Sequence, residues 1–414
     1  MWNVLIREFF TDLSRQKLRS FLTIVAIAWG TLSVILLLAF GRGLGSSMMN
    51  GMLGAGNQVI IIYGGQTSMN YEGLGIGRQI RYVEEDVDLL QRALPGIDYA
   101  SPQYGRWGVR LKVDETITTT YMEGVNPDFE IMRTMYPVQG GRFINQGDVD
   151  EMRKVAFLGD ELAKQLFGDL DPVGRQMELD GIPFTVIGVM QPKMQTSMNN
   201  GPDSDRPVIP YTTFRNMYGD RTVGSILIRP SAPSLQEEIK EGVISIFSTK
   251  YKFHPDDEQA IPMWDFIEME EMNRQVANGL EMFLFTVGFF TLMIAGVGVA
   301  NIMFVVVKER TKEIGLKMAL GARKSHIITQ FIVESLMISF TGGLIGLLIS
   351  VGIVEGVLAL NLQEGAGEFL GHPEISQLAV LLTTGVLAAI GLLAGIFPAI
   401  KAARVDPVES LRYE

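Results

Sequence analysis

Four stretches of 20 to 26 residues without a single charge constrain this chain more than any other feature of its sequence. A helix needs about 20 mainly apolar residues to cross the hydrocarbon core of a bilayer. Uncharged runs of this length are not typical of core helices in soluble proteins. The sequence therefore predicts four transmembrane helices, which we place at residues 21–41, 276–307, 327–355 and 375–400.

Among the short segments that flank the predicted spans, the basic residues lie on one side. Residues 1–20, 308–326 and 401–414 contain them, whereas the stretch from Glu355 to Glu374 has four acids and no Lys or Arg. Basic residues are enriched in cytoplasmic loops. We therefore expect both termini and residues 308–326 in the cytoplasm, and residues 356–374 as a short outer loop. The first span is longer than a signal-peptide core of roughly 7–15 residues, which favours a retained anchor.

Residues 42–275, between the first two spans, have a different pattern. Short apolar runs alternate with turn residues and predict strands. Three further stretches have helical character, at residues 83–94, 159–168 and 234–251. The strands are expected at residues 59–65, 107–113, 116–125, 154–159, 184–190, 206–211 and 225–230. The expected fold is thus an integral membrane α-helical protein with a large α+β extracytoplasmic domain inserted between the first and second spans.

Two cytoplasmic segments carry both apolar and charged residues. Residues 1–20 place apolar side chains near helical spacing, which predicts an amphipathic helix on the inner leaflet. Residues 308–326 predict a short helix with an ion pair between Glu313 and Lys317 and an apolar face. This second segment is a candidate docking point for another protein, and the alternative is a turn packed on its own spans.

Several kinds of chemistry are not expected in this chain. The sequence has no phosphate-binding G-x-x-x-x-G-K-[ST] loop, no H-E-x-x-H and no G-x-S-x-G motif. It has no cysteine and three histidines, so no metal site is predicted. Met190, Met194 and Met198 could be thioether ligands for Cu(I), but soft packing is the favoured use. The net charge of −11 argues against nucleic-acid binding.

The stretch NIMFVVVKERTKEIGLKMALGARKSHI resembles the signature of FtsX-like, MacB-type ABC transporter permeases. The tail FPAIKAARVDPVESLR and the inserted motifs GVNPDF, GGRF, VAFLGDELAKQLFG, DPVGR and FTVIGV are also similar to this family. The resemblance covers essentially the whole chain. It implies a core domain with a porter-like lobe and an inserted lobe near residues 125–215. MacB carries a fused N-terminal ATPase domain, whereas 20 residues precede the first span here, so we expect a separate ATPase subunit.

The resemblance further implies a non-catalytic permease subunit of the bacterial inner membrane that relays ATP-driven motion to its periplasmic domain. A second permease chain, identical or different, would complete a dimer, and a periplasmic adaptor is a further candidate partner. ATP and Mg²⁺ would bind the partner ATPase, so no cofactor is expected in this chain. The coupling residues carried over are Glu309, Arg310, Glu313, Ile314, Gly315, Lys317, Ala319, Gly321 and Ala322. The resemblance also implies a second cytoplasmic contact at Asp406, Pro407 and Glu409.

Alternative functions stay open on the sequence. Within the permease hypothesis, MacB-like efflux competes with lipoprotein extraction of the LolC/LolE kind, which predicts an apolar outer cavity near the membrane. An FtsX-like signalling protein that controls a cell-wall hydrolase and a membrane receptor without an ATPase are the other classes. The pairs Gly342-x-x-x-Gly346 and Gly391-x-x-x-Gly395 permit close helix approach, and we assign them to packing within one subunit.

Overall fold

The structure is a computed structural model that describes residues 17–195, 200–360 and 372–404. The chain divides into two compact units. Residues Met48–Arg274 form one unit, which we call the inserted domain. The residues before and after it form the other, which we call the helical unit. Most of the predicted amphipathic helix at residues 1–20 lies outside the described residues.

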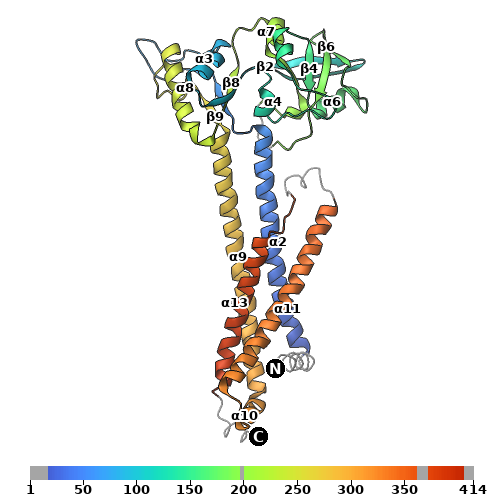
Figure 1. Cartoon of the computed structure of the whole chain (residues 1–414), viewed down its shortest axis with the longest axis vertical. Coiled ribbons are helices and arrows are strands. Elements are labelled where there is room, and N and C mark those ends of the chain that lie inside the picture. Colours follow the sequence, from blue (N-terminus) through green and yellow to red (C-terminus); the bar gives the residue numbers. More distant parts are fainter. Residues whose placement is uncertain (1–16, 196–199, 361–371, 405–414) are drawn as a thin grey trace. The chain divides into compact units, whose positions relative to one another are not determined.

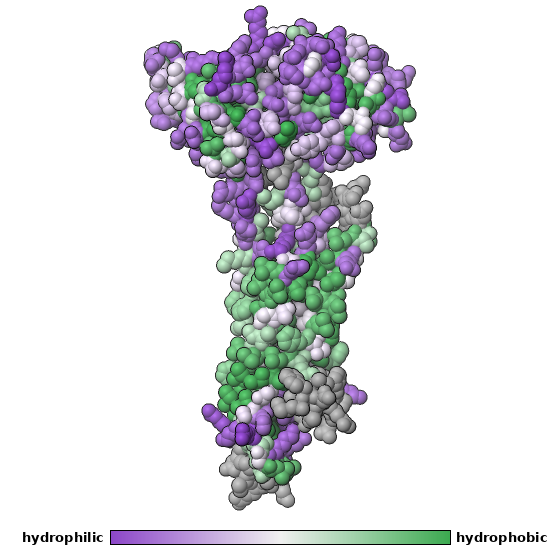
Figure 2. Space-filling view, in the orientation of Figure 1, coloured by the Kyte–Doolittle hydropathy of each residue, from purple (hydrophilic) through white to green (hydrophobic). Residues whose placement is uncertain are grey.

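Four long helices and one short helix make up the described part of the helical unit (Figure 1). Each long helix is long and apolar enough to cross a membrane. On the face shown in Figure 2, apolar side chains form a broad band over these helices, and hydrophilic side chains lie at its two ends. The chain is therefore a multi-pass membrane protein. The helices are α2 (Lys17–Ala55), α9 (Phe266–Glu309), α10 (Thr311–Ala319), α11 (Lys324–Ala359) and α13 (Gln377–Ala402).

Glycines let these helices approach one another closely. A Cβ atom added to Gly346 of α11 would lie 2.5 Å from the carbonyl oxygen of Ala28 in α2. On α13, Gly391 and Gly395 face the side chains of Ser339 and Ser335 in α11. Since lipid tails give apolar helices little reason to associate, close packing of small residues is a main source of attraction. Both Gly-x-x-x-Gly pairs thus pack within this unit, as the sequence predicted.

Replacing Gly346 tests this packing. Gly346→Leu should force α11 away from α2 and lower the stability of the detergent-solubilised protein by about 1–3 kcal/mol. Gly352→Leu on the same helix is the control, because a Cβ atom there meets nothing within 4 Å. Thermal unfolding should separate the two variants, and equal melting temperatures would contradict the packing described.

The inserted domain is an α+β fold, as predicted. Its strands are β1 (Ile60–Tyr63), β2 (Ile97–Val113), β3 (Thr116–Val125), β4 (Val155–Leu158), β5 (Gln176–Leu179), β6 (Ile182–Val189), β7 (Pro207–Pro210), β8 (Ser225–Pro230) and β9 (Met263–Asp265). Its helices are α3 (Glu85–Ala93), α4 (Phe129–Met132), α5 (Gln146–Asp150), α6 (Asp160–Phe167), α7 (Tyr211–Tyr218) and α8 (Gln236–Tyr251). Strands β5 and β9 and the first half of β2 were not predicted.

Strand β2 is long enough to pair with two groups of strands. Its first half pairs with β8, and the sheet continues through β1 to β9. Its second half pairs with both β3 and β5, which closes the ring β2–β3–β7–β4–β6–β5. Ring closure leaves these strands without a free edge. The inserted lobe that the family resemblance implies near residues 125–215 remains a prediction.

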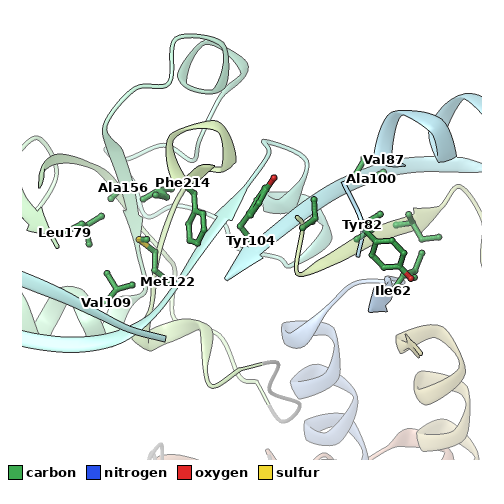
Figure 3. Packing of buried hydrophobic residues seen from close by; sticks show 14 of the residues in the cluster. Ile62, Tyr82, Val87, Ala100, Tyr104, Val109, Met122, Ala156, Leu179 and Phe214 are labelled. Atoms are coloured by element: carbon green, nitrogen blue, oxygen red, sulfur yellow. The ribbon is translucent and has the colours of Figure 1, made fainter. Parts of the chain in front are cut away.

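One apolar core connects the two strand groups (Figure 3). Tyr82 and Ile62 belong to the part under β1 and β8, and Val109 and Leu179 belong to the strand ring. Tyr104 lies between them, and its ring centroid is 5.4 Å from that of Phe214. Tyr104 is 2% exposed, so its ring is almost completely removed from water. Burial of a large apolar side chain stabilises the folded state by roughly 1.5–3 kcal/mol.

A cluster of buried charged side chains holds the segment that precedes β7 in position. Arg133 donates to Asp203 at 2.7 Å, and Lys193 donates to the other oxygen of Asp203 at 2.7 Å. Arg206 pairs with Glu123 in β3, which also accepts from Gln103 at 2.8 Å. Burial alone would raise the pKa of Asp203, but the surrounding cations outweigh it and lower that pKa. The carboxylate is therefore held in its charged form.

Asp203→Asn should destabilise the protein by about 3–5 kcal/mol, since breaking a buried pair leaves buried cations uncompensated. Asp205→Asn, at an exposed neighbour, is the matched control. The pKa of Asp203 is lowered in the folded state, so its contribution is complete above the unfolded pKa and decreases as the pH falls below it. Thermal unfolding should show a constant deficit from about pH 8 to about pH 5 and a smaller one below about pH 4. A deficit that grows on acidification would contradict this account.

Candidate functional site

The candidate site is the segment between the second and third long helices, residues 308–326, which we call the coupling segment. Helix α9 ends at Glu309, and the helical conformation breaks at Arg310 (φ −95°, ψ 14°). The hydroxyl of Thr311 donates to the carbonyl oxygens of Val307 and Lys308, at 3.1 and 2.9 Å. These bonds satisfy carbonyl groups that the end of α9 leaves without helical partners.

One face of α10 is buried in the helical unit. Ile314 is 4% exposed and belongs to the apolar core that also contains Val306, Ile327 and Phe331. Gly315 is buried beside it, and Met318 packs against the same core. Residues four apart share a helix face. This face therefore anchors α10 to its own transmembrane helices.

The opposite face of α10 is exposed. Leu316 is 50% exposed and Leu320 is 81% exposed, and the two lie four residues apart. Lys312, Glu313 and Ala319 are exposed on the same short helix. A pair of exposed leucines framed by charges has the composition of a protein contact with a polar rim. We call these five residues the outer face of α10.

Two ion pairs connect the start of the coupling segment to other helices of the unit. Arg19 of α2 donates to Glu309 at 3.2 Å, and both side chains are partly exposed. Arg310 lies 3.5 Å from a carboxylate oxygen of Glu334 in α11, and these side chains are 17% and 13% exposed. Lys317 donates to Gln330 of α11 at 3.5 Å. Movement of α10 would thus be transmitted to both α2 and α11.

A glycine ends the short helix. Gly321 has φ +95°, the left-handed region that glycine adopts without strain. Its N–H donates to the carbonyl of Met318 at 3.0 Å, and the N–H of Ala322 donates to that of Lys317 at 3.0 Å. This pair of bonds is the Schellman pattern. It turns the chain directly into α11, which begins at Lys324.

The residues carried over from the family resemblance therefore occupy different environments. Their assignment as ATPase contacts remains a prediction. Glu313 and Ala319 lie on the outer face of α10, whereas Ile314 and Gly315 are buried. Glu309, Arg310 and Lys317 contact other helices of the unit, and Gly321 and Ala322 form the turn. Asp406, Pro407 and Glu409 lie outside the described residues.

Sequence reasoning missed four residues of this site. Arg19 and Glu334 are the partners of Glu309 and Arg310, and they are separated from them by 290 and 24 positions in the chain. No local pattern reports such a contact. Leu316 and Leu320 belong to the apolar face predicted for residues 308–326, but the sequence did not identify them as exposed. Their spacing of four residues, offset from that of Ile314 and Met318, was the signal that could have separated the two faces.

Among the described residues, no group of three or more His, Asp or Glu side chains is arranged to hold a metal ion. The arrangement of the coupling segment is instead that of a contact surface with mechanical connections to its own helices.

Two family models match this chain. The model described as MacB-like periplasmic core domain matches residues 20–246, which is more than half of the chain. The model described as FtsX-like permease C-terminal matches residues 285–407, and this range contains the coupling segment. The chain belongs to the MacB-like, FtsX-like permease family.

Relatives within this permease family are similar over nearly the whole chain. The "Macrolide export ATP-binding/permease protein MacB" of Chlorobaculum tepidum is 32% identical over 407 residues, 98% of this chain and 60% of that protein. The "Pyoverdine export ATP-binding/permease protein PvdT" of Pseudomonas syringae pv. tomato is 30% identical, over 96% of this chain and 58% of that protein. The chain thus spans about 60% of the length of the curated relatives it matches.

A solved structure is also similar to the MacB-like part. The periplasmic region of MacB from Actinobacillus actinomycetemcomitans aligns with 54% of this chain and 95% of its own, at 19% identity and a TM-score of 0.43.

The two ion pairs of this permease should differ in their contribution to stability. Glu334→Gln should cost about 1–3 kcal/mol, because it removes a charged partner from the largely buried Arg310. Glu309→Gln should cost less than about 1 kcal/mol, because its pair with Arg19 is partly exposed. Thermal unfolding of both variants in detergent provides the measurement. A larger loss for Glu309→Gln would show that the exposed pair is the more important connection.

Proposed function

We propose that this chain is the permease part of an ABC-type transporter that exports its substrate. ATP hydrolysis by a partner subunit would move the coupling segment, and the transmembrane helices would relay this motion to the inserted domain. The observation that carries the proposal is the outer face of α10, exposed on a segment that family membership places in an FtsX-like permease region.

The outer face of α10 supports docking of a partner because its apolar side chains are not buried within the helical unit. Leu316 and Leu320 lie opposite the buried Ile314, which already anchors the helix. Exposed apolar residues rimmed by charges have the composition of a protein contact. Leu320 would supply apolar contact area, and Lys312 and Glu313 would fix the register through complementary charges.

The ion pairs support transmission of the motion. A displacement of α10 would be transmitted to α2 through the ion pair of Glu309 and Arg19. It would be transmitted to α11 through the ion pair of Arg310 and Glu334. Close glycine contacts couple α11 to α2 and α13, so these helices would respond as one packed body. Because α2 and α9 lead directly into the inserted domain, their motion would be passed to it along the chain.

ATP and Mg²⁺ belong to the partner in this proposal. The relatives from Chlorobaculum and Pseudomonas are named ATP-binding/permease proteins, and this chain matches about 60% of their length. The names of those relatives include macrolide and pyoverdine export, which supports export as the direction. We further propose a bacterial inner-membrane location with cytoplasmic termini, on the distribution of basic residues. A second permease chain and a periplasmic adaptor complete the proposed assembly.

The proposal is tested by charge reversal and polar substitution on the outer face of α10. Glu313→Lys and Leu320→Asp should each reduce the amount of ABC-type ATPase that co-purifies from native membranes by about tenfold, which corresponds to the loss of ~1.4 kcal/mol. Their thermal stability should be unchanged, because both side chains are exposed. Lys17→Glu, at an exposed position of α2, is the matched charge-reversal control.

Equal ATPase recovery with all variants would contradict docking at this face. Recovery of no ATPase with the unsubstituted protein, even after crosslinking, would overturn the transporter proposal itself.

A further inference from the structure

A pocket of about 320 Å³ lies within the helical unit, at the end opposite the coupling segment. Three helices form it: α2, α9 and α13. Its walls are almost entirely apolar, with Leu and Met side chains and one aromatic ring. The apolar lining residues are Leu38, Met282, Phe285, Leu378, Ala379 and Leu382.

One ion pair and one amide lie at the rim of this pocket. Arg42 donates from Nε to Glu281 Oε1 at 2.9 Å, and the two side chains are 33% and 38% exposed. Asn278 lines the same rim. Within the described part of the chain, this contact uses one N–H of the guanidinium and one carboxylate oxygen. The outer guanidinium N–H groups and the second oxygen of Glu281 therefore remain available to a ligand.

The sequence places this rim at the surface of the bilayer. Arg42 follows the uncharged run that ends at Phe40, and Glu281 directly precedes the run that begins at Met282. Helix α13 also begins its apolar run at this level, where Leu378 and Ala379 line the pocket. The ion pair is thus at headgroup depth, and the apolar walls extend from it into the hydrocarbon region.

We propose that this pocket binds one phospholipid whose headgroup contains both a phosphate and a primary ammonium. Its phosphate would accept from Arg42, its ammonium would donate to Glu281, and an acyl chain would lie against the apolar walls. A headgroup with both charges matches an opposite-charge pair better than an anionic headgroup does. The site is independent of the coupling segment, and the inference goes beyond the proposed function.

The pocket can be filled from its apolar wall without replacing a buried residue. Leu382 is 44% exposed and lines the pocket, whereas its neighbour Leu381 is 69% exposed and does not. Leu382→Trp should therefore displace the lipid, and Leu381→Trp is the matched control. Glu281→Gln should remove the contact with the ammonium while leaving the apolar walls intact.

The experiment reconstitutes the full chain in nanodiscs of phosphatidylethanolamine and phosphatidylglycerol in equal amounts, followed by native mass spectrometry of the released protein. We expect one retained phosphatidylethanolamine, its loss with Leu382→Trp and its retention with Leu381→Trp. Glu281→Gln should reduce the preference for phosphatidylethanolamine by about two- to fivefold, as expected for one partly exposed charge contact.

Equal lipid retention by Leu382→Trp and Leu381→Trp would overturn the proposal, since it would indicate lipid held by the general apolar surface. Preference for phosphatidylglycerol would overturn the assignment of the headgroup. A second copy of the chain is the other candidate occupant. Because the chain has no cysteine, Leu382→Cys in native membranes would form a disulfide-linked dimer in that case, and this result would also overturn the proposal.

Discussion

The helical unit depends on how charges at the ends of apolar helices are held at the membrane surface. Glu309 and Arg310 follow a long uncharged run, and each pairs with a residue of a different helix. These pairs fix the position at which α9 ends and α10 begins. They also make the coupling segment part of the bundle, so its buried face cannot move without a response from α2 and α11.

Close glycine packing and exposed leucines have opposite roles in this molecule. Where glycines face a neighbouring helix, backbone approaches backbone and little room is left for rearrangement, as between Gly346 and Ala28. Where leucines are exposed at the membrane surface, as at Leu320, a surface is available to a partner. A closely packed helix bundle with an exposed contact surface is suited to transmitting motion. In the inserted domain, the closed ring of strands and the buried charges around Asp203 hold the fold together.

Local patterns in the sequence were sufficient to predict much of the fold. Long uncharged runs located the four apolar helices, and short apolar runs located strands such as β3 and β8. The strands that were missed have weak local signals. Strand β9 has three residues, β5 reads QMEL, and the first half of β2 contains Pro102. These segments are strands because neighbouring strands supply their hydrogen bonds, which a single sequence does not report.

The sequence predicted which segment forms the candidate site, but not how the side chains of that segment are arranged. The resemblance identified residues 308–326, and it did not distinguish the buried Ile314 from the exposed Leu320. Exposure on a short helix is decided by which neighbours cover it, and the packing of α9 and α11 against α10 is tertiary structure that no local pattern reports. The partners Arg19 and Glu334 were unpredictable for the same reason.

Site-specific crosslinking tests the central claim most directly, because the chain has no cysteine and one can be placed at will. The account predicts that Leu320→Cys, treated with a short thiol-to-amine crosslinker in native membranes, links the chain to an ABC-type ATPase identified by mass spectrometry. Ile314→Cys, on the buried face, should give no such product. A crosslink from Ile314→Cys but not from Leu320→Cys, or no ATPase linked by either variant, would contradict the account.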